Sequence, residues 1–153
     1  MKKVFVLALL PFLFLACVKT SAPCANVTPA SEEPQILAYC SANGISYSKD
    51  PSGIYYQIID PGTNPHPTIT SIVSTTYTGK LLNGVVIDSS STALSFQLNQ
   101  LVVGWQIGLQ FIGKGGHIKM VVPSSLCYGC NGALPTVPGN SILYFDITLV
   151  DVK

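Results

Sequence analysis

Apolar and polar positions alternate in the stretch Leu94-Ser95-Phe96-Gln97-Leu98, and other short stretches are rich in β-branched and aromatic residues; both patterns predict β-strands. Asp60-Pro61-Gly62 and Asn83-Gly84 supply turn signals between such stretches, and the polar run from Ser89 to Ala93 predicts a loop. The expected strands cover residues 53–59, 68–79, 85–88, 94–98, 117–122 and 141–152.

Two stretches have helical spacing instead. One runs from Leu101 to Ile112, where apolar residues recur every three or four positions and Gly113 provides the stop. A shorter helix is expected over Glu32 to Ala42, with Ser31 as its N-cap and acidic residues in its first turn. The pattern therefore predicts an α+β fold, a twisted antiparallel sheet wrapping one short helix.

The first sixteen residues differ from the rest of the chain. Lys2 and Lys3 precede a twelve-residue apolar run, too short for a membrane-spanning helix of ~20 residues. The run ends in Phe14-Leu15-Ala16-Cys17, which resembles the lipobox of bacterial lipoproteins, in which the cysteine is acylated. The alternative is a plain secretory signal cut nearby. Both place the domain outside the cytoplasm.

The order of segments follows from these assignments. Residues 1–16 are the signal, 17–31 a flexible tether, 32–52 a helix and connection, and 53–153 the main domain. With Val18 after Cys17 in place of the aspartate that retains Gram-negative lipoproteins in the inner membrane, the expected address is the outer membrane, facing the periplasm.

Composition narrows the function classes. The chain of 153 residues suits one domain, with 48% hydrophobic and only 10% charged residues. Its basic residues are eight lysines with no arginine, against seven acids, which argues against nucleic acid as a partner. His66 and His117 lie at no metal-ligand spacing, so neither a metal nor another cofactor is expected.

Four cysteines remain if Cys17 carries lipid. In an oxidising compartment they suggest two disulfides with three connectivities, of which we favour Cys24 with Cys40 and Cys127 with Cys130. The C-x-x-C pair at 127–130 is also compatible with redox activity or with unpaired thiols. Because it follows a strand and enters a Gly/Pro-rich loop, and not a helix, a structural crosslink is favoured.

One Trp and one Tyr stand in stretches almost empty of charge. Trp105 lies within Val103 to Leu109, and Tyr128 lies within Ser125 to Gly129. Such stretches can form an apolar pocket with a single hydroxyl to orient a ligand. Taken by themselves, Trp105, Tyr77 and Phe145 would more often belong to an ordinary core, and Asp88 would usually be a turn or cap residue.

Beyond Thr75 the chain resembles the FKBP-type peptidyl-prolyl isomerases, the macrolide-binding family. The resemblance covers residues 77–153 well and 53–76 more weakly, and the N-terminal third is unmatched. The matching pieces, in family order, are Tyr77-Thr78-Gly79, residues 83–90, 94–98, 101–105, Gly115-Gly116, 122–124, 126–129, 137–141, 143–146 and Leu149.

The resemblance implies a half-barrel around a short helix and a prolyl pocket with Trp105 as its floor. It also implies hydrogen bonds to the bound peptide from the backbone N–H of Val102 and the hydroxyl of Tyr128. Asp88 would lie beside Tyr77, near the carbonyl that precedes proline. The implied pocket walls are Tyr77, Ile87, Leu94, Leu101, Val102, Val137 and Phe145.

The implied activity is cis/trans isomerisation of X-Pro bonds in unfolded or nascent polypeptides during envelope-protein folding, with a macrolide as a further ligand and a lipid anchor in the membrane. Ile87 replaces the family's usual Phe, and Leu94 stands where an aromatic is frequent. Ile87 favours the alternative of a non-catalytic or weakly catalytic chaperone. Thiol-disulfide exchange through Cys127 and Cys130 is a third hypothesis.

Overall fold

The computed structural model describes residues 24–153. The predicted signal, Cys17 and the first part of the predicted tether lie outside the described residues. Within residues 24–153, no helix combines the length and the hydropathy that crossing a membrane would require.

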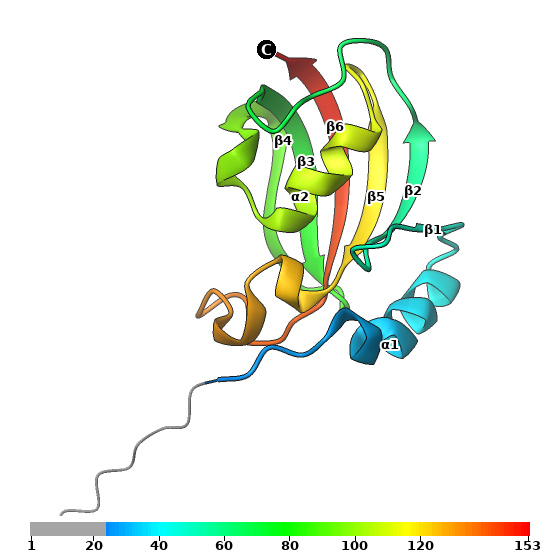
Figure 1. Ribbon diagram of the computed structural model, residues 1–153, viewed down its shortest axis with the longest axis vertical. Helices are drawn as coiled ribbons and strands as arrows, with labels where there is room; N and C mark the ends of the chain where they lie inside the picture. Colours follow the sequence, from blue (N-terminus) through cyan, green and yellow to red (C-terminus); the bar gives the residue numbers. More distant parts are fainter. Residues whose placement is uncertain (1–23) are drawn as a thin grey trace, which may run out of the picture.

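The described chain forms one six-stranded sheet with a short helix across it and a longer helix at one end (Figure 1). All strand pairs are antiparallel, in the order β1-β2-β5-β6-β3-β4, which confirms the α+β prediction. The helices are α1 (Pro29–Ala42) and α2 (Val103–Gly108), and the strands are β1 (Ser48–Lys49), β2 (Tyr55–Asp60), β3 (Ile72–Leu81), β4 (Val86–Gln97), β5 (His117–Val122) and β6 (Leu143–Val152).

Alternating side chains give the sheet two covered faces. On β5, Met120 and Val122 belong to the main core beneath α2, whereas Val121 belongs to a second core that includes Ile36 and Cys40 of α1. Because successive residues of a strand point to opposite faces, the two helices cover opposite sides of the sheet. The main core carries the site.

Helix α2 lies unusually close to β5 because two of its residues are glycines. A Cβ at Gly104 would lie 2.4 Å from Cγ1 of Val122, and one at Gly108 would lie 2.0 Å from Sδ of Met120. Spaced four residues apart, the two glycines share one helix face. Their missing side chains set the depth at which α2, and with it Trp105, rests on the sheet.

Both helices differ in length from their predictions. The stretch predicted as one helix from Leu101 to Ile112 has only six α-helical residues, with 3₁₀ turns at Leu98–Gln100 and Leu109–Phe111. Its glycines lower the helix propensity of the segment, but they allow it to pack closely on the sheet. Helix α1 begins before the predicted cap: Pro29 is its first residue, and Thr28 is the N-cap, whose Oγ1 accepts a hydrogen bond from the Ser31 N–H at 3.3 Å.

The predicted loop from Ser89 to Ala93 is wrong, because these residues lie inside the continuous strand β4. Their backbone pairs with β3, and the register shifts between the pairs Thr75–Leu94 and Tyr77–Ser90. Strand β4 is at the edge of the sheet, where polar side chains meet water and a bulge is tolerated. A polar run is therefore compatible with a strand here.

The contact between Gly104 and Val122 predicts a measurable coupling. Gly104→Ala should lower the free energy of unfolding by up to ~2 kcal/mol, because overpacking costs ~1–3 kcal/mol and the gain in helix propensity returns ~1. Adding Val122→Ala makes room for the new methyl, so the double variant should lose at least ~1 kcal/mol less than the sum of the single variants. Urea unfolding gives the free energy of unfolding of the parent, the two single variants and the double variant. As a control, Gly104→Ala combined with Ile36→Ala, in the other core, should be additive; additivity of the first pair would contradict the packing.

Candidate functional site

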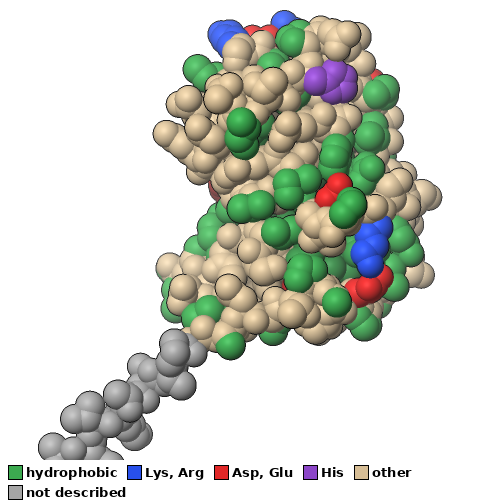
Figure 2. All heavy atoms as spheres, in the orientation of Figure 1, with side chains coloured by type: hydrophobic (Ala, Val, Ile, Leu, Met, Phe, Trp, Pro, Cys, Tyr) green, Lys and Arg blue, Asp and Glu red, His purple; other side chains and the backbone are tan. Residues whose placement is uncertain are grey.

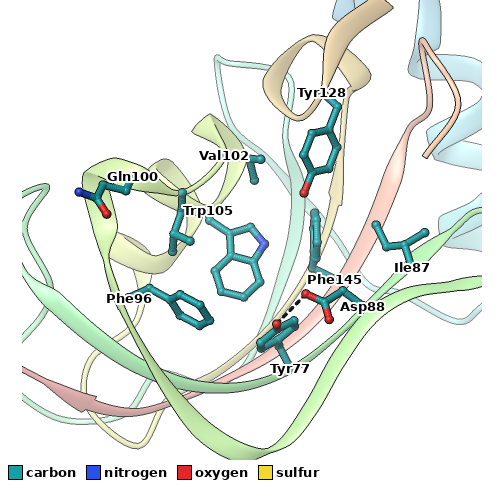
Figure 3. A pocket seen from close by; sticks show the side chains of 10 residues that line it. Tyr77, Ile87, Asp88, Phe96, Gln100, Val102, Trp105, Tyr128 and Phe145 are labelled. Atoms are coloured by element: carbon teal, nitrogen blue, oxygen red, sulfur yellow. Dashed lines mark hydrogen bonds between the residues drawn. The ribbon is translucent and has the colours of Figure 1, made fainter. Parts of the chain in front are cut away.

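A cavity of about 250 Å³ opens between α2, the edge of the sheet and the loop after β5 (Figure 3). Figure 2 shows the outline hollowed there, and the middle of this face carries mainly hydrophobic and uncharged side chains. Pockets for drug-sized ligands run to ~300–1,000 Å³, so this one suits a single ring with its adjoining peptide groups. Its lining residues are Tyr77, Ile87, Asp88, Phe96, Gln100, Leu101, Val102, Trp105, Tyr128 and Phe145.

The floor of the cavity is an aromatic cluster centred on Trp105, which is only 5% exposed. Its indole meets three rings nearly perpendicularly: Tyr77 at 5.1 Å, Phe145 at 5.6 Å and Phe96 at 6.4 Å between centroids. Edge-to-face contacts between aromatic rings are favourable and directional. The cluster therefore fixes the floor with rings from β3, β4, β6 and α2.

Gly79 explains why the ring of Phe145 can lie against the sheet. The two residues are paired across β3 and β6, and a Cβ at Gly79 would lie 3.0 Å from Cε1 of Phe145. A side chain at position 79 would crowd that ring, which would have to shift by a few tenths of an ångström. The Tyr77-Thr78-Gly79 sequence thus supplies one ring of the cluster and the space for another.

At the sheet side of the cavity, the Tyr77 hydroxyl donates a hydrogen bond to Oδ2 of Asp88 at 2.7 Å (Figure 3). Burial, followed by the hydrogen bond and the negative charge of Asp88, raises the pKa of Tyr77 to about 12. The phenol therefore stays protonated at neutral pH. The pair presents the remaining lone pairs of the carboxylate to the cavity.

Tyr128 stands at the opposite rim. Its ring is 41% exposed, and its hydroxyl points into the cavity from the loop after β5 (Figure 3). Burial, and then the nearby Cys127 and Asp88, raise the pKa of Tyr128 above its usual value. The hydroxyl is consequently available as a hydrogen-bond donor at neutral pH.

The cavity brings together eight of the ten residues that the sequence indicated, namely Tyr77, Ile87, Asp88, Leu101, Val102, Trp105, Tyr128 and Phe145. Leu94 is 42% exposed on β4, and Val137 is 4% exposed within the main core; neither lines the cavity. Sequence reasoning missed Phe96 and Gln100. Phe96 lies two residues beyond Leu94 and therefore on the same face of the strand, so the period of two could have pointed to it. Nothing in the sequence marks Gln100.

The favoured disulfide pairing is wrong. Cys24 is bonded to Cys130, and Cys40 and Cys127 are free. Cys40 is buried in the second core, where α1 holds it against the sheet, so Cys24 cannot reach it. Burial, followed by the charge of Glu32, raises the pKa of the Cys127 thiol far above its usual value. A protonated thiol is a poor nucleophile, which disfavours the thiol-disulfide exchange hypothesis.

Among residues 24–153, no three His, Cys, Asp or Glu side chains lie together as a metal site. Apart from Asp88, the cavity has no ionisable lining other than tyrosine hydroxyls. What the arrangement offers is an apolar floor, one oriented carboxylate and a hydroxyl at the rim.

Comparisons with known proteins agree with this geometry. The family model described as FKBP-type peptidyl-prolyl cis-trans isomerase matches residues 64–150. The FKBP-type peptidyl-prolyl cis-trans isomerase FkpA of Escherichia coli K12 is 42% identical over 105 residues, covering 67% of this chain and 38% of FkpA. A probable FKBP-type isomerase of Haemophilus influenzae is 41% identical over 127 residues, covering 81% of this chain and 53% of that protein. The chain thus spans about two-fifths to half the length of these relatives.

Solved structures show the same fold. The crystal structure of Escherichia coli FkpA superposes with a TM-score of 0.72 at 35% identity, covering 82% of this chain and 61% of that one. A peptidyl-prolyl cis-trans isomerase of Pseudomonas syringae pv. tomato superposes with a TM-score of 0.71 at 28% identity, covering 88% of this chain and 98% of that one.

The hydrogen bond between Tyr77 and Asp88 predicts a titration effect. Asp88→Asn should lower the pKa of Tyr77 from about 12, though not to the ordinary value, because burial is the largest cause of the shift. Since unfolded tyrosine ionises near pH ~10, Tyr77 contributes stability that is present below that pH and is lost as the pH rises through about 12. The tyrosinate absorbance of each protein, minus that of its Tyr77→Phe counterpart, isolates this group. Asp50→Asn, in a distant turn, is the control; an unchanged pKa in Asp88→Asn would contradict the pairing.

Proposed function

Because this chain belongs to the FKBP-type peptidyl-prolyl cis-trans isomerase family, we propose that it accelerates the rotation of X-Pro peptide bonds in unfolded or nascent polypeptides. The observation that carries the proposal is the cavity itself, an aromatic floor of ring-sized dimensions with hydrogen-bonding groups confined to its rim. A pyrrolidine ring matches such a floor in size and polarity.

The reaction requires no bond to be made. Resonance gives the peptide C–N bond a rotational barrier of ~18–20 kcal/mol, and unaided X-Pro isomerisation takes tens to hundreds of seconds at about room temperature. In water, hydrogen bonds to the carbonyl oxygen favour the planar, charge-separated amide. An apolar cavity removes part of that solvation, and the twisted amide, with less charge separation, loses less on entry. The cavity therefore binds the rotated state more tightly than the planar one.

Each lining group has a role in this scheme. The indole of Trp105 packs under the pyrrolidine ring and keeps water out. The Tyr128 hydroxyl and the Val102 backbone N–H, at the start of α2, donate hydrogen bonds to peptide carbonyls on either side of the rotating bond. Asp88, held by Tyr77, lies near the carbonyl that precedes proline. Ile87, Leu101 and Phe145 complete the apolar walls.

The same cavity offers a binding site to ligands other than peptides. A macrolide that offers a saturated ring with adjoining carbonyls would compete for the same floor, since these groups resemble a prolyl peptide. Ile87 presents less surface than the family's usual Phe, so we expect weaker macrolide binding than in relatives with the aromatic residue.

We propose further that the domain works outside the cytoplasm, tethered to the outer membrane through acylated Cys17 and facing the periplasm. The lipobox-like sequence at residues 14–17 supports the anchor. The Cys24–Cys130 bond supports an oxidising compartment, where disulfides persist. Proline-containing envelope proteins would then be its substrates.

Two substitutions test the isomerase proposal. Tyr128→Phe removes one hydrogen bond, worth ~0.5–1.5 kcal/mol, and should lower kcat/KM roughly two- to tenfold. Trp105→Ala removes the floor on which the ring packs and should lower kcat/KM far more than Tyr128→Phe does. It should also cost ~3–5 kcal/mol of folding stability, since it truncates a buried Trp. A protease-coupled assay on X-Pro peptides measures kcat/KM for both variants.

Tyr47→Phe and Val103→Ala are the matched controls, since each alters an exposed side chain outside the lining and should leave kcat/KM unchanged. Circular dichroism establishes that each variant is folded, and Trp105→Phe gives an intermediate loss if the alanine variant unfolds. The proposal fails if the parent binds unfolded chains without accelerating isomerisation above the thermal rate, which would favour the chaperone alternative.

A further inference from the structure

We infer that the segment ahead of the sheet, residues 24–32, positions the Tyr128 hydroxyl over the cavity. We call this segment the strap. In Figure 1 it runs beside the loop that follows β5, residues 123–131, which carries Tyr128. The strap lies outside the stretch matched by the family model, residues 64–150. The inference rests on the proposed function, in which that hydroxyl binds a peptide carbonyl.

The loop leaves the sheet after Val122 and has backbone hydrogen bonds on both sides of Tyr128. Before Tyr128, the Leu126 N–H donates to the Pro123 carbonyl and the Cys127 N–H to the Ser124 carbonyl, both at 3.0 Å. After it, the Gly132 N–H donates to the Tyr128 carbonyl at 3.1 Å, and the Asn140 N–H to the Gly129 carbonyl at 2.8 Å. Gly129, directly after Tyr128, has a φ of 55°, a left-handed conformation that favours glycine. These are backbone bonds, so the Tyr128 ring takes its direction from the backbone, which the strap contacts on both sides of Tyr128.

Glu32 holds the first end. Its side chain is 5% exposed, although it is a carboxylate, and it accepts a hydrogen bond from the Ser124 N–H at 2.9 Å. A buried carboxylate is retained only where it has such partners. The residue reaches across from α1 to the start of the loop, four positions before Tyr128.

Asn26 and Cys24 hold the second end, two positions after Tyr128. Oδ1 of Asn26 accepts a hydrogen bond from the Cys130 N–H at 2.7 Å, and Cys24 is joined to Cys130 by the disulfide. The contact is close: a Cβ at Gly129 would lie 2.6 Å from Oδ1 of Asn26. Tyr128 thus stands between two anchors that both come from the strap.

A double-mutant cycle tests whether the strap acts through this hydroxyl. Cys24→Ser/Cys130→Ser and, separately, Asn26→Ala should each lower kcat/KM for an X-Pro peptide by two- to tenfold, as Tyr128→Phe does. In the Tyr128→Phe background the same changes should cause no further loss, because the group they position is already gone. Asn26→Asp keeps the acceptor oxygen and should restore most of the activity.

Glu33→Ala is the matched control on the same helix. Glu33 accepts hydrogen bonds from Lys49 and Tyr55 and has no bond to the loop, so its loss should leave kcat/KM unchanged. Assays run well below each variant's unfolding midpoint separate positioning from loss of fold. Equal losses in both backgrounds would overturn the inference, since the strap would then act on general stability. Full activity in both Cys24→Ser/Cys130→Ser and Asn26→Ala would overturn the inference as well.

A readout independent of turnover separates this inference from the proposed function. In NMR spectra of protein with ring-labelled tyrosine, the Tyr128 resonances are assigned by their absence in Tyr128→Phe. They should show nuclear Overhauser effects to other lining side chains. These contacts should vanish in Cys24→Ser/Cys130→Ser and persist in Glu33→Ala. If the parent is inactive but these contacts depend on the strap, the proposed function fails and the positioning stands. If they survive removal of the disulfide and of Asn26 together, the positioning fails.

Discussion

The edge-to-face packing of one indole against three rings is the constraint on which the site depends. Trp105 reaches the floor from α2, Tyr77 from β3, Phe96 from β4 and Phe145 from β6, so four elements must be in register before the cluster can form. Such contacts favour particular angles as well as burial. The floor is therefore rigid, and a rigid apolar surface can discriminate between a planar and a twisted amide where a yielding one would adapt to both.

The main backbone features around the site serve this cluster. Gly104 and Gly108 let α2 approach β5, and Gly79 leaves room for Phe145. The second core, on the opposite face, holds α1 against the sheet through Ile36 and Cys40. That contact matters for the cavity because α1 carries Glu32, whose carboxylate reaches the loop at its rim. The two faces of the sheet are thus connected through the N-terminal helix.

Much of the fold and the site could be predicted from local patterns. The alternation in His117 to Val122 gave β5 with its bounds, and the resemblance to the isomerase family led to Trp105, Tyr128 and the pair Tyr77 and Asp88. The failures have a physical cause. Which cysteine meets Cys24 is decided by the path of a chain across 106 residues of separation, and no local pattern records that path. The serines of β4 resemble a loop because an edge strand, with water beside it, tolerates the polar residues that loops use. Leu94 was misplaced because it is exposed on the edge strand, whereas Phe96, two residues along the same strand, lines the cavity; no local pattern distinguishes the two positions.

The bond between Cys24 and Cys130 has a consequence for how this molecule comes into being. It closes a ring that contains strands β1 to β5 but not β6, so even a denatured chain keeps Cys24 and Cys130 together. By the chain-entropy argument, a closure of roughly 100 residues removes denatured conformations worth ~4–5 kcal/mol. A chain that is synthesised from its N-terminus contains the second sulfur only after residue 130 has been added. Strand β6, which pairs with both β3 and β5, follows residue 130, so the bond can form before the sheet is complete and can hold the first five strands together until β6 joins them.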